Sequence, residues 1–311
     1  MIYYSNGVAS AKSRELFSRA FYDQLINAKD YESCLELVLS TTTFAGEECD
    51  VDKFLDAKKQ ELFDFIKHNS PINEIIDFFL LAQDYENLGV ICRLVKAGKN
   101  LHGTLLSGKT DSKDLCEFVK TGISRGISKE VIEAYKGMPK DLSLAQIDLY
   151  YKQKKYETLK SKMKSQIMKT LLFDILDLQN VCIILRCEKE DDFQKNRVVV
   201  GNLNDKLLDK ILKRDETVLF ELSGLTRQIA QIAFIKNKQK AFSLIDKLSN
   251  ELPLLSIKPF AKDTDTIAPF LDYCFSCLAQ LKNIKMVLSL KKNGVKCDFD
   301  NKILGVSYGK R

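Results

Sequence analysis

Two stretches of the chain decide its fold: Asp84-Tyr-Glu-Asn-Leu-Gly-Val-Ile-Cys-Arg93 and Asp177-Leu-Gln-Asn-Val-Cys-Ile-Ile-Leu-Arg186. Each begins with an acidic residue, has an Asn three positions later and ends with an Arg. Apolar residues stand one, three and four positions after the Asn, which is the spacing of one face of a helix. A third copy, Gln280 to Ser289, keeps the Asn as Asn283 but loses the acidic residue and the Arg.

The register of these copies extends beyond the helices. Asn87 and Asn180 lie 93 positions apart, and Gly108 and Gly201 each follow their Asn by 21 positions. A unit of about a hundred residues is longer than a solenoid repeat. Because polar and Gly positions recur at fixed offsets, we expect three similar helical lobes. We place them at residues 1–121, 122–214 and 215–311.

Helical spacing of apolar residues dominates the chain and predicts an all-α fold. The expected helices span residues 16–39, 51–67, 71–95, 111–121 and 142–185. Ser70-Pro71 predicts a helix start, and Ser143 with Gln146 predicts a capping box. The β-like run Val198-Val-Val200 is too short to define a sheet. With only 14 Gly and 5 Pro, the chain has few turn residues for a β-sandwich or barrel.

The composition excludes several classes of protein. It is 45% hydrophobic and 29% charged, as in ordinary globular chains. The longest apolar runs have five residues, whereas a membrane-spanning helix needs about 20. The N-terminal residues lack the basic and apolar regions of a secretory signal, and nine Cys in such a chain are typical of a reducing compartment. Arg supplies only nine of the 48 basic residues, so no nucleic-acid partner is expected.

The densest basic stretch runs from Lys152 to Lys164. Its apolar residues Tyr156, Leu159 and Met163 have helical spacing, which predicts an amphipathic helix with a solvated basic face. A patch for an acidic partner is the alternative interpretation.

One motif matches a nucleotide-binding pattern. Gly103-Thr-Leu-Leu-Ser-Gly-Lys-Thr110 fits the phosphate-loop pattern GxxxxGK[ST]. Such a loop follows a buried parallel strand, but Lys96 to His102 do not read as a strand, and the chain shows no alternating βα pattern. Gly108 also occupies the repeat position of Gly201, where no Lys and Thr follow. We therefore interpret the motif as a structural turn.

Other candidate sites have simpler interpretations. Cys274 and Cys277 lack a second pair at zinc spacing and are expected to be buried. His68 and His102 have no partner at ligand spacing, and the acidic loops Glu47–Asp50 and Glu188–Asp192 lack the features of a calcium loop. Asp174, at the end of Leu171-Leu-Phe-Asp174, could pass for a magnesium-binding residue, but it lies inside a predicted amphipathic helix. The sequence therefore predicts no catalytic, cofactor-binding or metal-binding residues.

Three features together resemble a known family. They are the opening Tyr3 to Arg14, the repeated acidic-x-x-Asn helix ending in Arg, and the C-terminal helix Asn283 to Gly294. These features are similar to the C subunits of bacterial and archaeal V/A-type ATPases, the family of the d subunit of the vacuolar enzyme. The whole chain takes part in the resemblance, although Ser289 departs from the repeated Arg.

The resemblance implies a funnel-shaped protein of three helical lobes with pseudo-threefold symmetry. It implies a non-catalytic central-stalk rotor subunit, peripheral on the cytoplasmic face of the membrane. Its partners would be the D and F shaft subunits and the membrane rotor ring, with no cofactor. Such a protein would couple ATP hydrolysis or synthesis to ion transport. The alternatives are a helical scaffold or adaptor and, less favoured, a nucleotide-binding protein that uses Gly103 to Thr110.

Overall fold

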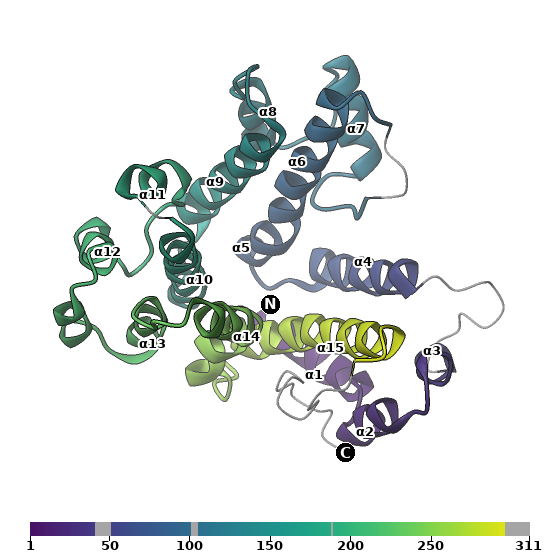
Figure 1. Cartoon of the computed structure of the whole chain (residues 1–311). Coiled ribbons are helices and arrows are strands. Elements are labelled where there is room, and N and C mark those ends of the chain that lie inside the picture. The colour runs from purple at the N-terminus through teal and green to yellow at the C-terminus, as the bar shows by residue number, and fades with distance from the viewer. Residues whose placement is uncertain (41–50, 101–104, 188, 296–311) are drawn as a thin grey trace. The chain divides into compact units, whose positions relative to one another are not determined.

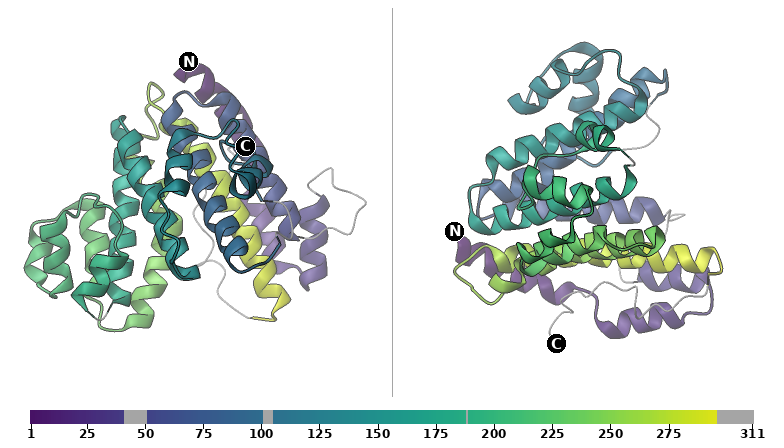
Figure 2. Two further views of the ribbon diagram at one scale, coloured as in Figure 1. Left: turned by 90° about the horizontal axis from the view of Figure 1, so that it is seen from above. Right: turned by 60° about the vertical axis from the view of Figure 1, so that its left-hand side comes forward.

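The computed structural model describes residues 1–40, 51–100, 105–187 and 189–295. No strand occurs among these residues, so the predicted all-α fold is confirmed. The helices fall into two compact units, one of residues 72–256 and one that joins residues 1–71 to residues 257–311 (Figures 1 and 2). Within the described ranges, no helix is both long enough and apolar enough to cross a membrane.

The unit of residues 72–256 is a chain of packed helices. Its elements are α5 (Asn73–Ile76), the π-helical turn η2 (Asp77–Leu81), α6 (Ala82–Lys96), α7 (Ser112–Thr121), α8 (Lys129–Lys136), α9 (Leu144–Lys162), α10 (Gln166–Arg186), α11 (Glu190–Asn196), α12 (Asp205–Leu212), the 3-10 helix η3 (Glu216–Phe220), α13 (Gly224–Ala233) and α14 (Lys238–Ile257). Helix α6 packs on α9, α9 on α10, and α10 on α13 (Figure 1).

Among the described residues of this unit, two hydrophobic clusters are each built around one copy of the repeated helix. The first surrounds α6, where Leu88 packs with Phe118 of α7 and Val131 of α8. The second surrounds α10, where Val181 packs with residues of α12 and α13 such as Ile229. The two copies therefore play the same structural role.

The other unit joins the two ends of the chain. It contains α1 (Ile2–Lys12), the 3-10 helix η1 (Ser13–Glu15), α2 (Arg19–Asn27), α3 (Tyr31–Ser40), α4 (Val51–Asn69), the 3-10 helix η4 (Lys258–Phe260) and α15 (Ala268–Lys292). Helix α15 contains the third copy of the repeat and packs on α1, α3 and α4. Its Val287 and Leu288 share a core with Tyr22 and Leu25 of α2. The division into lobes at 1–121, 122–214 and 215–311 stays a prediction, and this core groups α2 with α15.

Two expected helices are each divided into two. The helix expected over residues 16–39 is interrupted between α2 and α3, and the one expected over 142–185 is interrupted between α9 and α10. A polar side chain begins the second part in both cases. Asp30 accepts the N–H of Ser33 at 2.9 Å before α3, and Ser165 accepts the N–H of Met168 at 3.3 Å before α10. Such a cap satisfies a backbone donor that has no helical partner, so the apolar period continues while the helix does not.

Of the two helix starts predicted from local sequence signals, one is confirmed and the other is wrong. The capping box is confirmed: the Ser143 hydroxyl accepts from the N–H of Gln146 at 3.3 Å, and the Gln146 side chain accepts from the N–H of Ser143 at 2.8 Å. The start predicted at Ser70-Pro71 is wrong, because Ile72 has an extended backbone (φ −145°, ψ 148°) and α5 begins at Asn73.

The basic stretch of α9 is not simply a solvated face. Its apolar side chains are buried as predicted, but several of its lysines bond within the unit. Lys155 pairs with Glu86 of α6 at 2.9 Å, and Lys162 pairs with Glu130 of α8 at 2.6 Å. The Lys160 ammonium donates to the carbonyl of Val200 at 2.7 Å. These lysines link α9 to the elements around it.

Candidate functional site

The recurring acidic residue and Asn of the first copy hold the segment that follows α6. The buried Asp84 carboxylate accepts the N–H of Thr110 at 3.2 Å and its hydroxyl at 3.1 Å. Asn87, one turn later on the same helix, donates its side-chain N–H to the carbonyl of Leu106 at 2.8 Å. Residues 106–110 are thereby fixed along the helix.

The second copy makes the same contacts 93 positions later. The Asp177 carboxylate accepts the N–H of Leu203 at 2.9 Å, the counterpart of the Thr110 contact. The side chain of Asn180 donates to the carbonyl of Val199 at 3.3 Å, the counterpart of the Leu106 contact, and accepts from the N–H of Val198 at 3.1 Å. The β-like run at 198–200 is thus a non-helical segment bonded to α10. We call each pair of side chains with its bound segment an Asp–Asn clamp.

The third copy has changed the chemistry of the clamp. Gln280 stands where the acidic residue stood, and its side chain bonds both the N–H (3.1 Å) and the carbonyl (3.3 Å) of Phe17. Asn283 is buried, as are its counterparts. The positions that would correspond to Gly108, near Gly305, lie outside the described residues.

The recurring glycines allow the bound segments to approach the helices. A Cβ on Gly108 would collide with the carbonyl oxygen of Leu80 and the carboxylate of Asp84. A Cβ on Gly201 would collide in the same way with the carbonyl oxygen of Phe173 and with Asp177. Neither glycine has a positive φ, unlike Gly98 after α6, which has φ 65° as its predicted place at a helix end requires. Gly108 and Gly201 therefore serve close packing.

Burial raises the pKa of the carboxyl group in each clamp. Desolvation raises the pKa of Asp84 to about 7, although bonds from Thr110 and the charge of Lys109 oppose the shift. Desolvation likewise raises the pKa of Asp177 to about 7, against its hydrogen bonds from Leu203 and Asn202. Both carboxyls therefore keep their protons to higher pH than an exposed Asp.

Asp174 is a further buried carboxyl, and the sequence did not predict a structural role for it. It accepts the hydroxyl of Ser256 at 2.7 Å and the side-chain N–H of Asn202 at 3.2 Å, which ties the end of α14 to α10. Burial raises its pKa as well. No periodicity relates residues 82 positions apart, so only the fold reveals the contact with Ser256.

The N–H groups and side chains in the described part of the phosphate-loop motif form contacts within the chain. The N–H of Lys109 donates to the carbonyl of Leu80 at 3.2 Å, and that of Gly108 donates to the carbonyl of Thr110 at 3.1 Å. The Lys109 ammonium pairs with Asp77 at 2.8 Å. A phosphate loop needs these N–H groups, this Lys and the Thr hydroxyl for its ligand, and here the first clamp uses them. Gly103 lies outside the described residues.

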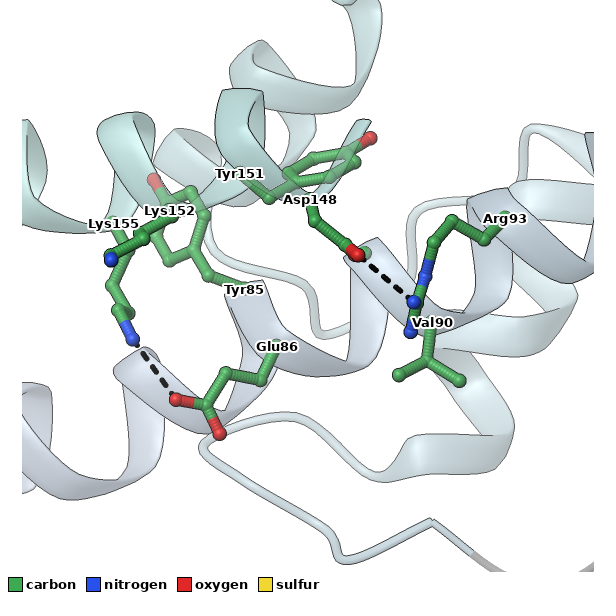
Figure 3. Close-up of a pocket in the computed structure, with 9 residues that line it drawn as sticks. Tyr85, Glu86, Val90, Arg93, Asp148, Tyr151, Lys152 and Lys155 are labelled. Carbon is green, nitrogen blue, oxygen red and sulfur yellow. Dashed lines mark hydrogen bonds and ion pairs between the residues drawn. The ribbon is translucent and has the colours of Figure 1, made fainter. Parts of the chain in front are cut away.

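A charged groove of about 300 Å³ lies between α6 and α9 (Figure 3). Two ion pairs cross it, Glu86 with Lys155 at 2.9 Å and Arg93 with Asp148 at 2.9 Å. Lys152 also lines the groove, and its ammonium donates to the side chain of Gln179 on α10 at 2.7 Å. The charges of the groove are largely paired with one another, which suits the joining of helices. The Arg of the repeat thus has a defined partner in the first copy.

The remaining candidate residues form no reactive constellation where the structure describes them. Cys274 is buried as predicted, whereas Cys277 is only half-buried. Desolvation raises the pKa of Cys277 to about 12, which disfavours the reactive thiolate. His68 contacts the carbonyl of Asp64 in its own helix at 2.6 Å. Over the described ranges, no group of three His, Cys, Asp or Glu side chains is placed to hold a metal ion. His102 and the loop 47–50 lie outside those ranges.

A comparison with protein families identifies the family of the chain. The family described as ATP synthase (C/AC39) subunit matches residues 5–299, which include both clamps and the third copy. The chain belongs to this family. The resemblance noted from the sequence, to the C subunits of V/A-type ATPases, is confirmed. A search among curated proteins found no significant match.

Membership of the C/AC39 family bears on the type of site to expect. The family is an accessory component of an ATP synthase and not a catalytic one. Membership implies association with other parts of a rotary ATPase. The site to expect in such a protein is therefore a surface that contacts other subunits.

Replacing the close-packed glycines tests the clamps. We expect Gly108→Ala and Gly201→Ala each to lower the free energy of unfolding by about 2 kcal/mol or more, because a backbone carbonyl and a buried carboxylate must move. Gly89→Ala is the matched control in α6, since its Cβ would make only ordinary contacts of 3.6 to 3.9 Å. Alanine is also the better helix former there. Urea unfolding measures all three, and equal losses for all three would contradict the clamp geometry.

The raised carboxyl pKa values predict a pH dependence. Between the ordinary pKa of 3.8 and about 7, the folded state holds a proton on Asp84 that the unfolded state has lost. Stability therefore falls as pH rises through this interval, by at most about 1.4 kcal/mol per pH unit for each carboxyl. Asp84→Asn and Asp177→Asn should each remove part of this slope, and the exposed Asp141→Asn should retain all of it. Urea unfolding from pH 4 to 8 measures it; a wild-type slope of opposite sign relative to these variants would refute the assignment.

The phosphate-loop motif has a direct test. We expect calorimetry with Mg–ATP to detect no binding that depends on Lys109, because the first clamp occupies the loop. Lys109→Ala and the exposed Lys113→Ala should behave as the wild type does. Saturable ATP binding that Lys109→Ala abolishes and Lys113→Ala preserves would instead establish a nucleotide site.

Proposed function

We propose that this protein is a non-catalytic rotor subunit in the central stalk of a V/A-type ATPase. It would link the rotating shaft, formed by the D and F subunits, to the membrane ring that translocates ions. In this way it would couple ATP hydrolysis or synthesis elsewhere in the assembly to ion transport. The observation that carries the proposal is the family match over residues 5–299.

The stiffness of the described helices supports this function. A part that transmits torque must deform little between its two attachment points, and tightly packed protein interiors have low compressibility. In the unit of residues 72–256, packing runs continuously from α6 through α9 and α10 to α13. Each repeated helix in this unit also binds its following segment through buried side-chain bonds, as Asn87 binds Leu106. These bonds limit relative movement of the elements.

The chemistry of the described residues also fits a mechanical part. The repeated polar side chains are used within the chain: Asp84 and Asp177 bind backbone N–H groups, and Arg93 pairs with Asp148. The proposed work therefore needs no bound cofactor, and the protein would act through its surfaces. As a rotor part it would be peripheral, on the cytoplasmic face of the membrane.

Depletion and restoration of the protein test the proposal. In membranes depleted of this chain, we expect ATP hydrolysis by the catalytic subunits to continue while ATP-driven ion uptake is lost. Adding the purified chain should restore ion uptake and return the protein to the membrane with the shaft subunits. The opposite outcome, a chain that stays in the wash fractions and leaves ion uptake unchanged, would show that it is a helical scaffold with another role.

A further inference from the structure

The Arg that ends each of the first two repeated helices has different surroundings in the two copies. In the first copy, Arg93 on α6 pairs with Asp148 on α9 at 2.9 Å (Figure 3). In the second copy, the Arg186 guanidinium lies over the ring of Phe242 on α14, 5.8 Å from the ring centroid. Within the described ranges, no ion pair or hydrogen bond of this guanidinium accompanies the ring contact. The second Arg therefore has an aromatic neighbour where the first has a carboxylate.

Arg186 lines a pocket of about 550 Å³ formed by α9, α10 and α11. Lys152 lines the same pocket, and Leu149 and Ile183 form part of its wall. The Lys152 ammonium donates to the side chain of Gln179, a neutral acceptor, at 2.7 Å. An ammonium has three N–H donors and a guanidinium has five. Both cations therefore keep donors for a ligand in the pocket.

The charge around the Lys152 ammonium is positive. Burial lowers its pKa most, and the positive charges of Lys155 and Arg186 lower it further, with no carboxylate opposing the shift. Lys155 is itself paired with Glu86 in the groove of Figure 3. A negatively charged group beside Lys152 and Arg186 would relieve their repulsion, which a neutral group would not do.

Acidic residues stand at one edge of this pocket. The first turn of α11 contains Glu190, Asp191 and Asp192, of which Asp192 lines the pocket. Burial raises the pKa of the Cys187 thiol, and the charge of Asp192 raises it further. In the part of the chain that the structure describes, Asp192 forms no ion pair with either cation of the pocket; Glu188 lies outside that part. These carboxylates would repel a multiply charged phosphate more strongly than a singly charged carboxylate.

We propose that this pocket, the Arg186 pocket, receives the carboxylate of an Asp or Glu side chain on a partner polypeptide. The planar guanidinium would bind the carboxylate through two parallel N–H bonds, and the Lys152 ammonium would add a third. The first copy of the repeat shows this chemistry within the chain, because Arg93 binds the Asp148 carboxylate in a groove that Lys152 also lines. In the second copy the carboxylate would come from another molecule.

The identity of the partner rests on the proposed function. If the protein is a rotor subunit, the carboxylate belongs to another polypeptide of the same ATPase. The pocket itself lies within the unit of residues 72–256, so its binding chemistry is testable without the assembly.

Three matched peptides test the chemistry of the pocket. The probes are a fluorescent amphipathic peptide of Leu, Gln and Glu, the same peptide with Gln for every Glu, and the same peptide with phosphoserine for every Glu. We expect the Glu peptide to bind the full-length chain most tightly, with affinity falling as salt is raised. Arg186→Gln and Lys152→Met should each weaken its binding about tenfold. Arg227→Gln, at an exposed Arg on α13, is the matched control and should leave binding unchanged.

The proposal is overturned if the Glu peptide fails to bind, or if it binds the two pocket variants as tightly as the wild type. Equal binding of the Gln peptide would show that no carboxylate is needed, and tighter binding of the phosphoserine peptide would assign the pocket to phosphate groups instead. Circular dichroism and urea unfolding of each variant check that it folds.

Carbodiimide cross-linking identifies the occupant in membranes, because this reagent joins a Lys amine to a carboxylate in contact with it. After the chain has rebound to depleted ATPase membranes, we expect mass spectrometry to find Lys152 joined to an Asp or Glu of another polypeptide. Lys152→Met should remove this product. A Lys152 joined only to Asp192 of its own chain would show that the pocket supplies its own carboxylate, and the proposal would fail.

The same membranes separate this inference from the proposed function. We expect Arg186→Gln and Lys152→Met to be released at lower salt than the wild type and Arg227→Gln. If the wild type rebinds and restores ion uptake while the pocket variants resist salt equally, the pocket proposal fails and the function stands. If the wild type binds the Glu peptide through the pocket but never binds the membranes, the function fails and the pocket stands.

Discussion

The structure depends on a buried carboxylate that accepts backbone N–H groups from a segment far along the chain. Taking such a group out of water is costly unless hydrogen bonds replace the lost hydration. Asp84 receives them from Thr110 and Asp177 from Leu203. The segment must therefore pass within hydrogen-bond distance of the helix, which leaves no space for a side chain at Gly108 or Gly201. The Asp, the Asn and the Gly are needed for the same contact between a helix and the segment after it. They recur together for that reason.

This constraint connects local chemistry to the function proposed here. Each clamp fixes the segment that leads into α7 or α12, and those helices complete the hydrophobic core around α6 or α10. A helix and the segment after it then move as one body. Such coupling fits the torque-transmitting role that we propose for this member of the C/AC39 family. The residues of the phosphate-loop pattern also have structural contacts: Gly108 allows the close approach, the Lys109 ammonium pairs with Asp77, and the Thr110 hydroxyl donates to Asp84.

The sequence predicted the features whose signal repeats along the chain and some, but not all, of those with a local signal, since the helix start at Ser70-Pro71 was wrong. The all-α class, the capping box at Ser143 and the recurrence of the Asn and Gly positions followed from period, spacing and cap chemistry, whereas the contacts of the clamps came from the structure. Contacts between distant residues without a repeat could not be foreseen, such as Asp174 with Ser256 and Lys155 with Glu86. The roles of Gly108 and Gly201 were only half predicted: their positions recur, but the sequence does not distinguish a glycine needed for φ from one needed for space.

The third copy shows how the contacts change when the buried acidic residue is replaced. Gln280 in place of the acidic residue is neutral, so its burial carries no penalty for a charge, and it bonds the backbone of Phe17 near the other end of the chain. The same helix position thus joins the two ends of one unit where the earlier copies hold a following segment. Because α1 packs on α15 and its buried side chains are small, the large residues at the start of α1 have no place in that interface. Their exposure is a consequence of this packing.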